Sequence, residues 1–255
     1  MPRIRIGVQL HPQHTTWESF AAAVRHAEAL GVDTVWNWDH FFPLYGDPQG
    51  SHFEGWTLLT AMAMITSRVE VGCLVTCNSY RNPALLSNMA KTVDHISGGR
   101  LILGMGAGWF ERDYREYGYP FGTAADRLRA LKEALPIIKR RWEVDAPPPT
   151  RPIPILIGGG GEKVTLRLVA QYAQMWHSFS TLATIGHKSA VLEQWCAEIG
   201  RDPREIERSV TPRPGESLDA YVAAGVTHFI YGMGEPWDFA PVEAALRWRE
   251  GLGAA

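Results

Sequence analysis

The sequence has few cysteines and no pattern that would arrange them in pairs. Cys73, Cys77 and Cys196 are an odd number, and neither a CxxC motif nor a cluster of histidines accompanies them. This composition argues against a disulfide framework and gives no indication of a metal site. We therefore expect three buried thiols in a reducing compartment.

The sequence also lacks an excess of charge and a long apolar run. Its formal net charge is −2, which gives no basic surface for nucleic acid and no polybasic signal for a membrane. No stretch approaches the roughly 20 apolar residues of a membrane span. Because a strand is predicted to begin as early as Arg3, we also expect no signal peptide and a cytoplasmic protein.

Predicted strands and helices alternate strictly along the 255 residues. Such alternation predicts a parallel sheet with right-handed crossovers. Eight strand–helix units in this length favour a single-domain (β/α)8 TIM barrel, spanning residues 1–255, over an open doubly wound sheet. The predicted strands cover residues 4–10, 34–38, 69–75, 100–104, 155–157, 175–179, 207–211 and 227–231.

Three segments interrupt this regular pattern. Residues 109–119 are rich in aromatic and charged side chains without a helical apolar stripe, so we predict a loop there. Pro136 is expected to kink or break the helix that the apolar residues of 128–142 indicate. The proline-rich residues 145–154 form an extended connector, because the strand–helix alternation resumes after them.

Two glycine clusters follow predicted strands. In the first, GMGAG at 104–108, Trp109 stands where a GxGxxG fingerprint needs its third glycine. The second, Gly158 to Gly161, is followed by Glu-Lys-Val and is not a Walker A loop. It still leaves backbone N–H groups free before a helix, which indicates an anion or phosphate site, with a plain flexible turn as the alternative.

Polar residues at the strand ends provide candidates for chemistry. Asp39-His40 closes the second strand, where a histidine can donate a hydrogen bond or act as a general acid, or can be merely structural. Thr76 and Asn78 follow the third strand and suit a flat heteroaromatic ligand. The charged residues 111–115 favour a solvated cluster that holds the loop closed, with Glu111 as a second catalytic candidate.

Several segments together resemble the bacterial luciferase-like monooxygenase superfamily, and most closely its branch that uses the deazaflavin coenzyme F420. The resemblance rests on DHISGGRLILGMGAGW at 94–109, supported by Trp38-Asp39-His40, Glu54-Gly55-Trp56, Tyr80-Arg81-Asn82-Pro83 and ILIGGGG at 155–161. It covers almost the whole chain. The first block is specific for the superfamily but does not determine the cofactor.

The resemblance implies a barrel whose mouth holds a flavin or deazaflavin ring. It places Asp39 and His40 near the ring and a non-prolyl cis peptide at Val75-Thr76 beneath it. It implies that the glycine run passes the ribityl chain, with contacts from Gly106, Ala107, Gly108 and Trp109. It also assigns the phosphate to Gly158, Gly159, Gly160 and Gly161.

Three departures from the family pattern bear on the substrate. Sugar-phosphate dehydrogenases of the superfamily have a proton-donating glutamate where this chain has Trp109, which argues against a sugar dehydrogenase. The short connector 143–154 replaces a longer insertion and predicts a more open substrate pocket. Gln174 stands where aspartate is common.

The leading hypothesis is therefore an F420-dependent oxidoreductase that moves a hydride between the coenzyme and a small organic substrate, with His40 and Glu111 as catalytic candidates. One alternative is an FMN-dependent monooxygenase that uses oxygen and receives reduced flavin from a partner reductase. Further alternatives are a non-catalytic flavin-binding barrel and a phosphate-binding barrel enzyme unrelated to flavins. The family resemblance also implies a homodimer.

Overall fold

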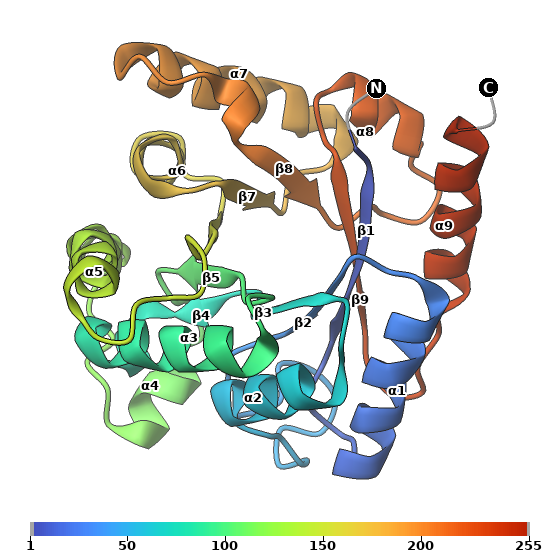
Figure 1. Cartoon of the computed structure of the whole chain (residues 1–255), viewed down its shortest axis with the longest axis horizontal. Helices are drawn as coiled ribbons and strands as arrows, with labels where there is room; N and C mark the ends of the chain where they lie inside the picture. The colour runs from blue at the N-terminus through green and yellow to red at the C-terminus, as the bar shows by residue number, and fades with distance from the viewer. Residues whose placement is uncertain (1–2, 254–255) are drawn as a thin grey trace.

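The computed structural model describes residues 3–253, in which nine parallel strands form one curved sheet (Figure 1). Neighbouring strands follow the order β3-β2-β1-β9-β8-β7-β6-β5-β4. The strands are β1 (Arg5–Leu10), β2 (Thr34–Asn37), β3 (Glu70–Cys73), β4 (Thr76–Cys77), β5 (Leu103–Gly106), β6 (Ile155–Gly158), β7 (Met175–Ser178), β8 (Glu207–Val210) and β9 (His228–Met233).

The two edge strands of this sheet are consecutive pieces of one barrel strand. β3 pairs with β2 and β4 pairs with β5, and only Leu74 and Val75 lie between β3 and β4. The Leu74-Val75 peptide bond is cis, one bond earlier than the resemblance implied. A parallel bridge between Val71 of β3 and Leu101, just before β5, also connects the two edges of the sheet. The nine strands thus correspond to eight positions around a nearly closed barrel, which confirms the predicted fold.

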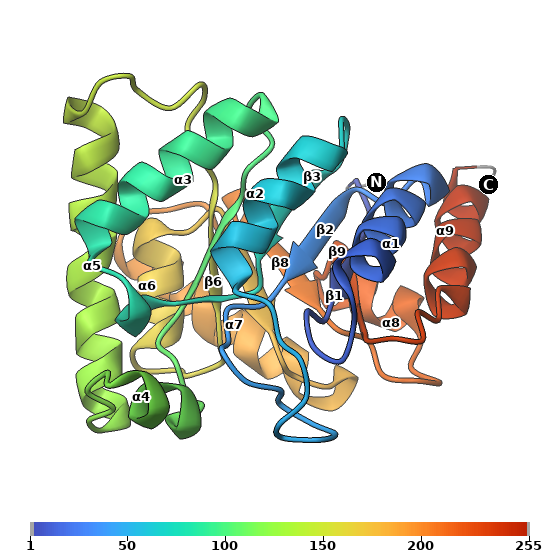
Figure 2. The same cartoon turned by 90° about the horizontal axis from the view of Figure 1, so that it is seen from below.

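Helices surround the barrel and cover its outer face (Figures 1 and 2). The residues that point outward from the strands pack on the helices, whereas Trp36, Leu74, Ile102, Leu156, Met175 and Ile230 form a separate apolar cluster inside the barrel. The helices are α1 (Trp17–Leu30), α2 (Gly55–Ile65), α3 (Pro83–Ser97), α4 (Glu111–Tyr117), α5 (Ala124–Val144), α6 (Thr165–Tyr172), α7 (Leu182–Glu198), α8 (Leu218–Ala223) and α9 (Ala240–Leu252), with short 3-10 turns η1 (Asn78–Tyr80) and η2 (Pro203–Glu205).

Ionic side chains fill the end of the barrel at which the strands begin. Arg5 pairs with Glu70 and Glu207, and the buried His228 lies 2.8 Å from Glu207 through Nδ1. Burial alone would raise the pKa of Glu207, but His228 and Arg5 lower it to about 2. Charged pairs therefore occupy the end of the barrel at which the strands begin.

Three local predictions differ from the structure. The fourth barrel strand is β5, shifted toward the glycines, because a Cβ at Gly104 would stand only 2.0 Å from the carbonyl oxygen of Cys73 in the neighbouring strand. The predicted loop 109–119 contains helix α4, in which Asp113 and Tyr114 are buried. Pro136 does not break α5, because it lies on the exposed side, where solvent can reach the backbone carbonyl that the proline leaves without a donor.

All three thiols are free and buried, as expected from the sequence. Within residues 3–253, no helix combines the length and apolar character needed to cross a bilayer.

Candidate functional site

A cavity of about 410 Å³ opens at the end of the barrel where the strands finish. In Figure 2 this is the lower edge, where α4 and the long loop between β2 and α2 also lie. Nine predicted site residues line the cavity: Asp39, His40, Val75, Gly106, Ala107, Gly108, Trp109, Gly158 and Gly159. Five others do not: Thr76, Asn78, Glu111, Gly160 and Gly161. Eight further residues line the cavity that the sequence analysis did not assign to the site: Gln9, Trp38, Leu44, Leu74, Cys77, Tyr80, Thr165 and Phe179.

A buried carboxylate orients His40. Nδ1 of His40 lies 2.6 Å from Oδ2 of Asp113, which also accepts a 2.8 Å hydrogen bond from the Tyr80 hydroxyl, while Oδ1 accepts the backbone N–H of Phe41 at 3.1 Å. Since a carboxylate only accepts, Nδ1 of His40 carries the hydrogen of this contact. Nε2 is then the ring nitrogen left for a ligand in the cavity that His40 lines.

Helix α4 delivers Asp113 to this position. Asp113 and Tyr114 are the two buried residues of α4, and the Tyr114 hydroxyl lies 3.1 Å from Sγ of Cys77 and donates to Ser79 at 3.0 Å. Glu111 is the exposed first residue of the same helix. The predicted solvated cluster is therefore wrong for Asp113, because this carboxylate is wholly buried among hydrogen-bond donors.

The Tyr80 hydroxyl remains a donor across the physiological range. Burial is the largest cause that raises the pKa of Tyr80, and the nearby Cys77 and Asp113 raise it further. The phenol consequently stays protonated and supports Asp113. No short-range sequence signal identifies this arrangement, because Asp113 lies 73 residues from His40 and 33 from Tyr80.

Asp39 is buried and fully engaged by the protein. Arg81 donates to both of its carboxylate oxygens, at 2.7 and 3.0 Å, and the backbone N–H of Cys77 donates to one of them at 3.0 Å. Arg81 also pairs with Glu54, whose side chain caps α2. This network ties the end of β2 to the end of β4, so Asp39 supports the floor of the site.

Trp38 provides a flat wall that two histidines hold in place. The imidazole of His11 stacks on the indole with ring centroids 4.1 Å apart, and on another side Nε2 of His52 accepts the indole N–H at 2.9 Å. Burial lowers the pKa of His11 to about 4, so its ring is neutral at physiological pH. Neutral rings stack without the cost of a buried charge.

Packing inside the protein accounts for the glycines nearest the cavity. A Cβ added at Gly106 would lie 2.5 Å from the Val75 side chain, and a Cβ added at Gly158 would lie 2.9 Å from it. Gly108 has φ +82°, and a Cβ there would stand 1.9 Å from the Tyr114 hydroxyl. These glycines therefore allow the side chains of Val75 and Tyr114 to approach the strand ends closely.

The loop after β6 has different surroundings. The nearest atom to a Cβ on Gly160 would be Cε of Lys188 at 3.9 Å, which leaves space over this turn. Thr165, at the start of α6, is more than nine-tenths buried and lines the cavity. Lys188 lies close by, paired with Glu162 at 2.6 Å. Hydroxyl and backbone donors thus gather at this end of the cavity.

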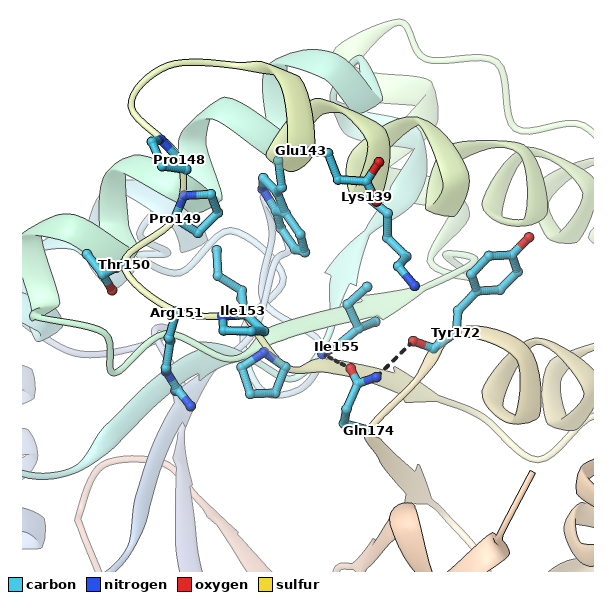
Figure 3. A pocket seen from close by; sticks show the side chains of 13 residues that line it. Lys139, Glu143, Pro148, Pro149, Thr150, Arg151, Ile153, Ile155, Tyr172 and Gln174 are labelled. Carbon is cyan, nitrogen blue, oxygen red and sulfur yellow. Dashed lines mark hydrogen bonds between the residues drawn. The ribbon is translucent and has the colours of Figure 1, made fainter.

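A larger cavity of about 570 Å³ lies elsewhere, at the beginning of β6 between α5 and the proline-rich connector (Figure 3). Gln174 borders it and accepts the backbone N–H of Ile155 at 3.0 Å, as the dashed line shows. None of the predicted site residues lines this cavity. Across residues 3–253, no cluster of three or more His, Cys, Asp or Glu side chains is arranged to hold a metal ion.

A parallel barrel with a cavity at the carboxyl ends of its strands defines a large class of α/β enzymes. The sequence model of the luciferase-like monooxygenase family matches residues 3–250. The chain belongs to this family.

Curated relatives narrow the comparison. An uncharacterized protein of Mycobacterium tuberculosis is 28% identical over 244 residues, covering 84% of this chain and 86% of the relative. The F420-dependent hydroxymycolic acid dehydrogenase of the same species is 26% identical, covering 98% and 68%. The F420-dependent glucose-6-phosphate dehydrogenase of Amycolatopsis mediterranei is 33% identical over 170 residues, but the match spans only 48% of its length and 59% of this chain.

Solved structures share the fold at low sequence identity. An F420-dependent secondary alcohol dehydrogenase, in complex with an F420-acetone adduct, has a TM-score of 0.82 at 18% identity and covers 91% of this chain and 94% of that one. The oxygenating constituent of 3,6-diketocamphane monooxygenase from Pseudomonas putida, in complex with FMN, has a TM-score of 0.64 at 18% identity, covering 82% and 67%.

Proposed function

We propose that this protein is an F420-dependent oxidoreductase that moves a hydride between C5 of the deazaflavin and a small organic substrate. The observation that carries the proposal is the Asp113–His40 pair, which presents one imidazole nitrogen to a cavity with a flat aromatic wall. The relatives named F420-dependent dehydrogenases support the choice of cofactor.

The residues around the cavity fit such a cofactor. The Trp38 wall suits a flat ring, and the donors near Thr165 and the open turn at Gly160 suit a phosphate at the other end. When bound, the coenzyme supplies two-electron hydride chemistry. The protein then has to orient the substrate and handle the proton.

His40 is the group that handles the proton in this proposal. With Nδ1–H directed at Asp113, neutral His40 has a lone pair on Nε2. For an alcohol substrate, Nε2 of His40 would accept the hydroxyl proton, and bound F420 would supply the hydride acceptor that the conversion of the alcohol to a carbonyl requires. Asp113 stabilises the resulting imidazolium, and the reverse reaction returns the proton from Nε2 to the carbonyl oxygen.

The FMN-dependent monooxygenase is the second candidate, favoured by the fold shared with an FMN-bound oxygenating enzyme. Oxygen activation requires nitrogen at position 5 of the flavin, which the deazaflavin lacks, and it would require a partner reductase. The two functions therefore differ first in the cofactor that binds.

A titration with F420 and, separately, FMN tests the proposal. Trp38 and Trp109 both line the cavity, so intrinsic tryptophan fluorescence reports on its occupancy. We expect micromolar or tighter binding of F420 and much weaker binding of FMN. The opposite preference would make the oxygen-using monooxygenase the better assignment, and binding of neither would contradict both.

A further inference from the structure

A second, basic cavity lies beside the proposed active site, between α5 and α6. Its volume is about 330 Å³, and we refer to it as the basic groove. Four cationic side chains line it: Arg129 and Lys132 from α5, Lys163 from the turn before α6 and Arg167 from the first turn of α6. No acidic residue is among the lining residues. This concentration of positive charge contrasts with the net charge of −2 of the whole chain.

The basic groove begins where the active-site cavity ends. Val164 lines the groove, and the next residue, Thr165, lines the active-site cavity together with Gly158 and Gly159. Lys163 follows the glycine turn by only two residues. The first turn of α6 is thus the shared wall, and a ligand seated at the glycine turn can continue over it into the groove.

The charges of the groove are poorly neutralised by the protein. In the described part of the chain, neither Lys132 nor Lys163 has an ion-pair partner within 4.0 Å, and the 3.0 Å pair of Arg129 with Asp126 is exposed. Lys188, on the other side of the glycine turn, is paired with Glu162 at 2.6 Å. The unbalanced positive charge therefore lies on the α5–α6 side, where it attracts an anionic ligand.

We propose that the basic groove binds the acidic glutamate chain that coenzyme F420 carries beyond its phosphate. This inference rests on the proposed function. The apolar side chains of Leu128, Val164 and Leu168 line the groove among the cations, so methylene groups of the chain can pack while its carboxylates meet the lysines and arginines. FMN ends at its phosphate and does not reach the groove.

The test measures dissociation constants by tryptophan fluorescence for three ligands: F420 with several glutamates, F420 from which the glutamates have been removed, and FMN. The variants are Lys132→Gln/Lys163→Gln and, as a matched control, Arg140→Gln, which removes an exposed charge from α5 outside the groove. Exposed ion pairs contribute about two- to five-fold each. We expect the double variant to weaken the binding of long-chain F420 by about four- to twenty-five-fold and to leave the binding of the other two ligands unchanged.

The salt dependence of F420 binding provides an independent test. Because exposed charges are screened, the advantage of long-chain over shortened F420 should shrink as the salt concentration rises from about 0.05 to 0.5 M. Equal loss of both F420 forms in the double variant, or no advantage of the long chain in wild type, overturns the groove assignment but leaves the proposed function standing. Failure of both F420 forms to bind the wild-type protein overturns the proposed function and the groove assignment with it.

Discussion

Replacing Asp113 with asparagine tests the central feature of the site, the orientation of His40. The carboxylate accepts from His40 and Tyr80 through one oxygen and from the Phe41 backbone through the other. An amide has one accepting oxygen and one NH2 group, so it cannot satisfy all three donors. If the NH2 group faces His40, the ring must move its hydrogen to Nε2, and the nitrogen facing the cavity changes from acceptor to donor.

Two effects are expected, one on stability and one on the reaction rate. A buried donor left without its partner costs about 1–3 kcal/mol, so Asp113→Asn should lower the free energy of unfolding by that amount. Loss of the correctly oriented base should reduce the rate of hydride transfer by about 10²- to 10⁴-fold, the usual contribution of general acid–base catalysis. The dissociation constant of the coenzyme should change little, because Asp113 does not line the cavity.

Nitrogen-15 NMR of histidine-labelled protein measures the tautomer without any substrate. In the wild type, His40 should show hydrogen on Nδ1, and in Asp113→Asn it should show hydrogen on Nε2. Glu116→Gln, an exposed change in the same helix, should leave the spectrum and the rate unaltered. An unchanged His40 signal and an unchanged rate in Asp113→Asn would refute this account of the site.

Three further predictions concern stability. Gly108→Ala should lower the melting temperature much more than Gly118→Ala does, as measured by differential scanning fluorimetry. Both glycines have positive φ, but only a Cβ at position 108 would lie within 4 Å of other atoms. Arg81→Met should cost about 3–5 kcal/mol in urea unfolding because it leaves Asp39 buried without its cation, and a loss below 1 kcal/mol would contradict the pairing. Burial lowers the pKa of His177 to about 3 in the folded protein, below its value in the unfolded chain. As the pH falls from 7 to 5, the unfolded state therefore binds a proton that the folded state does not, and His177 should remove about 2 kcal/mol of stability. This loss should be absent in His177→Gln.

The sequence was sufficient to predict the barrel because the signal for each strand is local. Apolar runs such as ILIG at 155–158, with the glycines that follow them, can be recognised as strands from a few consecutive residues. The boundaries of β5 could not be predicted in the same way. Gly104 lies inside the strand because the carbonyl of Cys73 approaches it from the neighbouring strand, and that contact exists only after the barrel forms.

The site was predictable only in part, for a related reason. His40 and the glycine turns stand at strand ends, where barrels collect ligand residues, so their position in the chain suggests a role. Asp113 and Tyr114 lie in a segment whose charges read as solvent-exposed, and α4 shows no apolar stripe because it buries only these two adjacent residues. Their partners come from β4, η1 and the β2–α2 loop, which no local pattern reveals.

The shortness of α4 has a consequence for how activity responds to temperature and denaturant. This seven-residue helix lies outside the barrel wall and is held by Asp113, Tyr114 and the aromatic cluster around Tyr80. Such a segment can open as a separate cooperative unit at far lower free energy than the barrel itself. Each opening withdraws the carboxylate from His40, so amide protons of α4 should exchange with solvent in step with inactivation while those of the central strands remain protected.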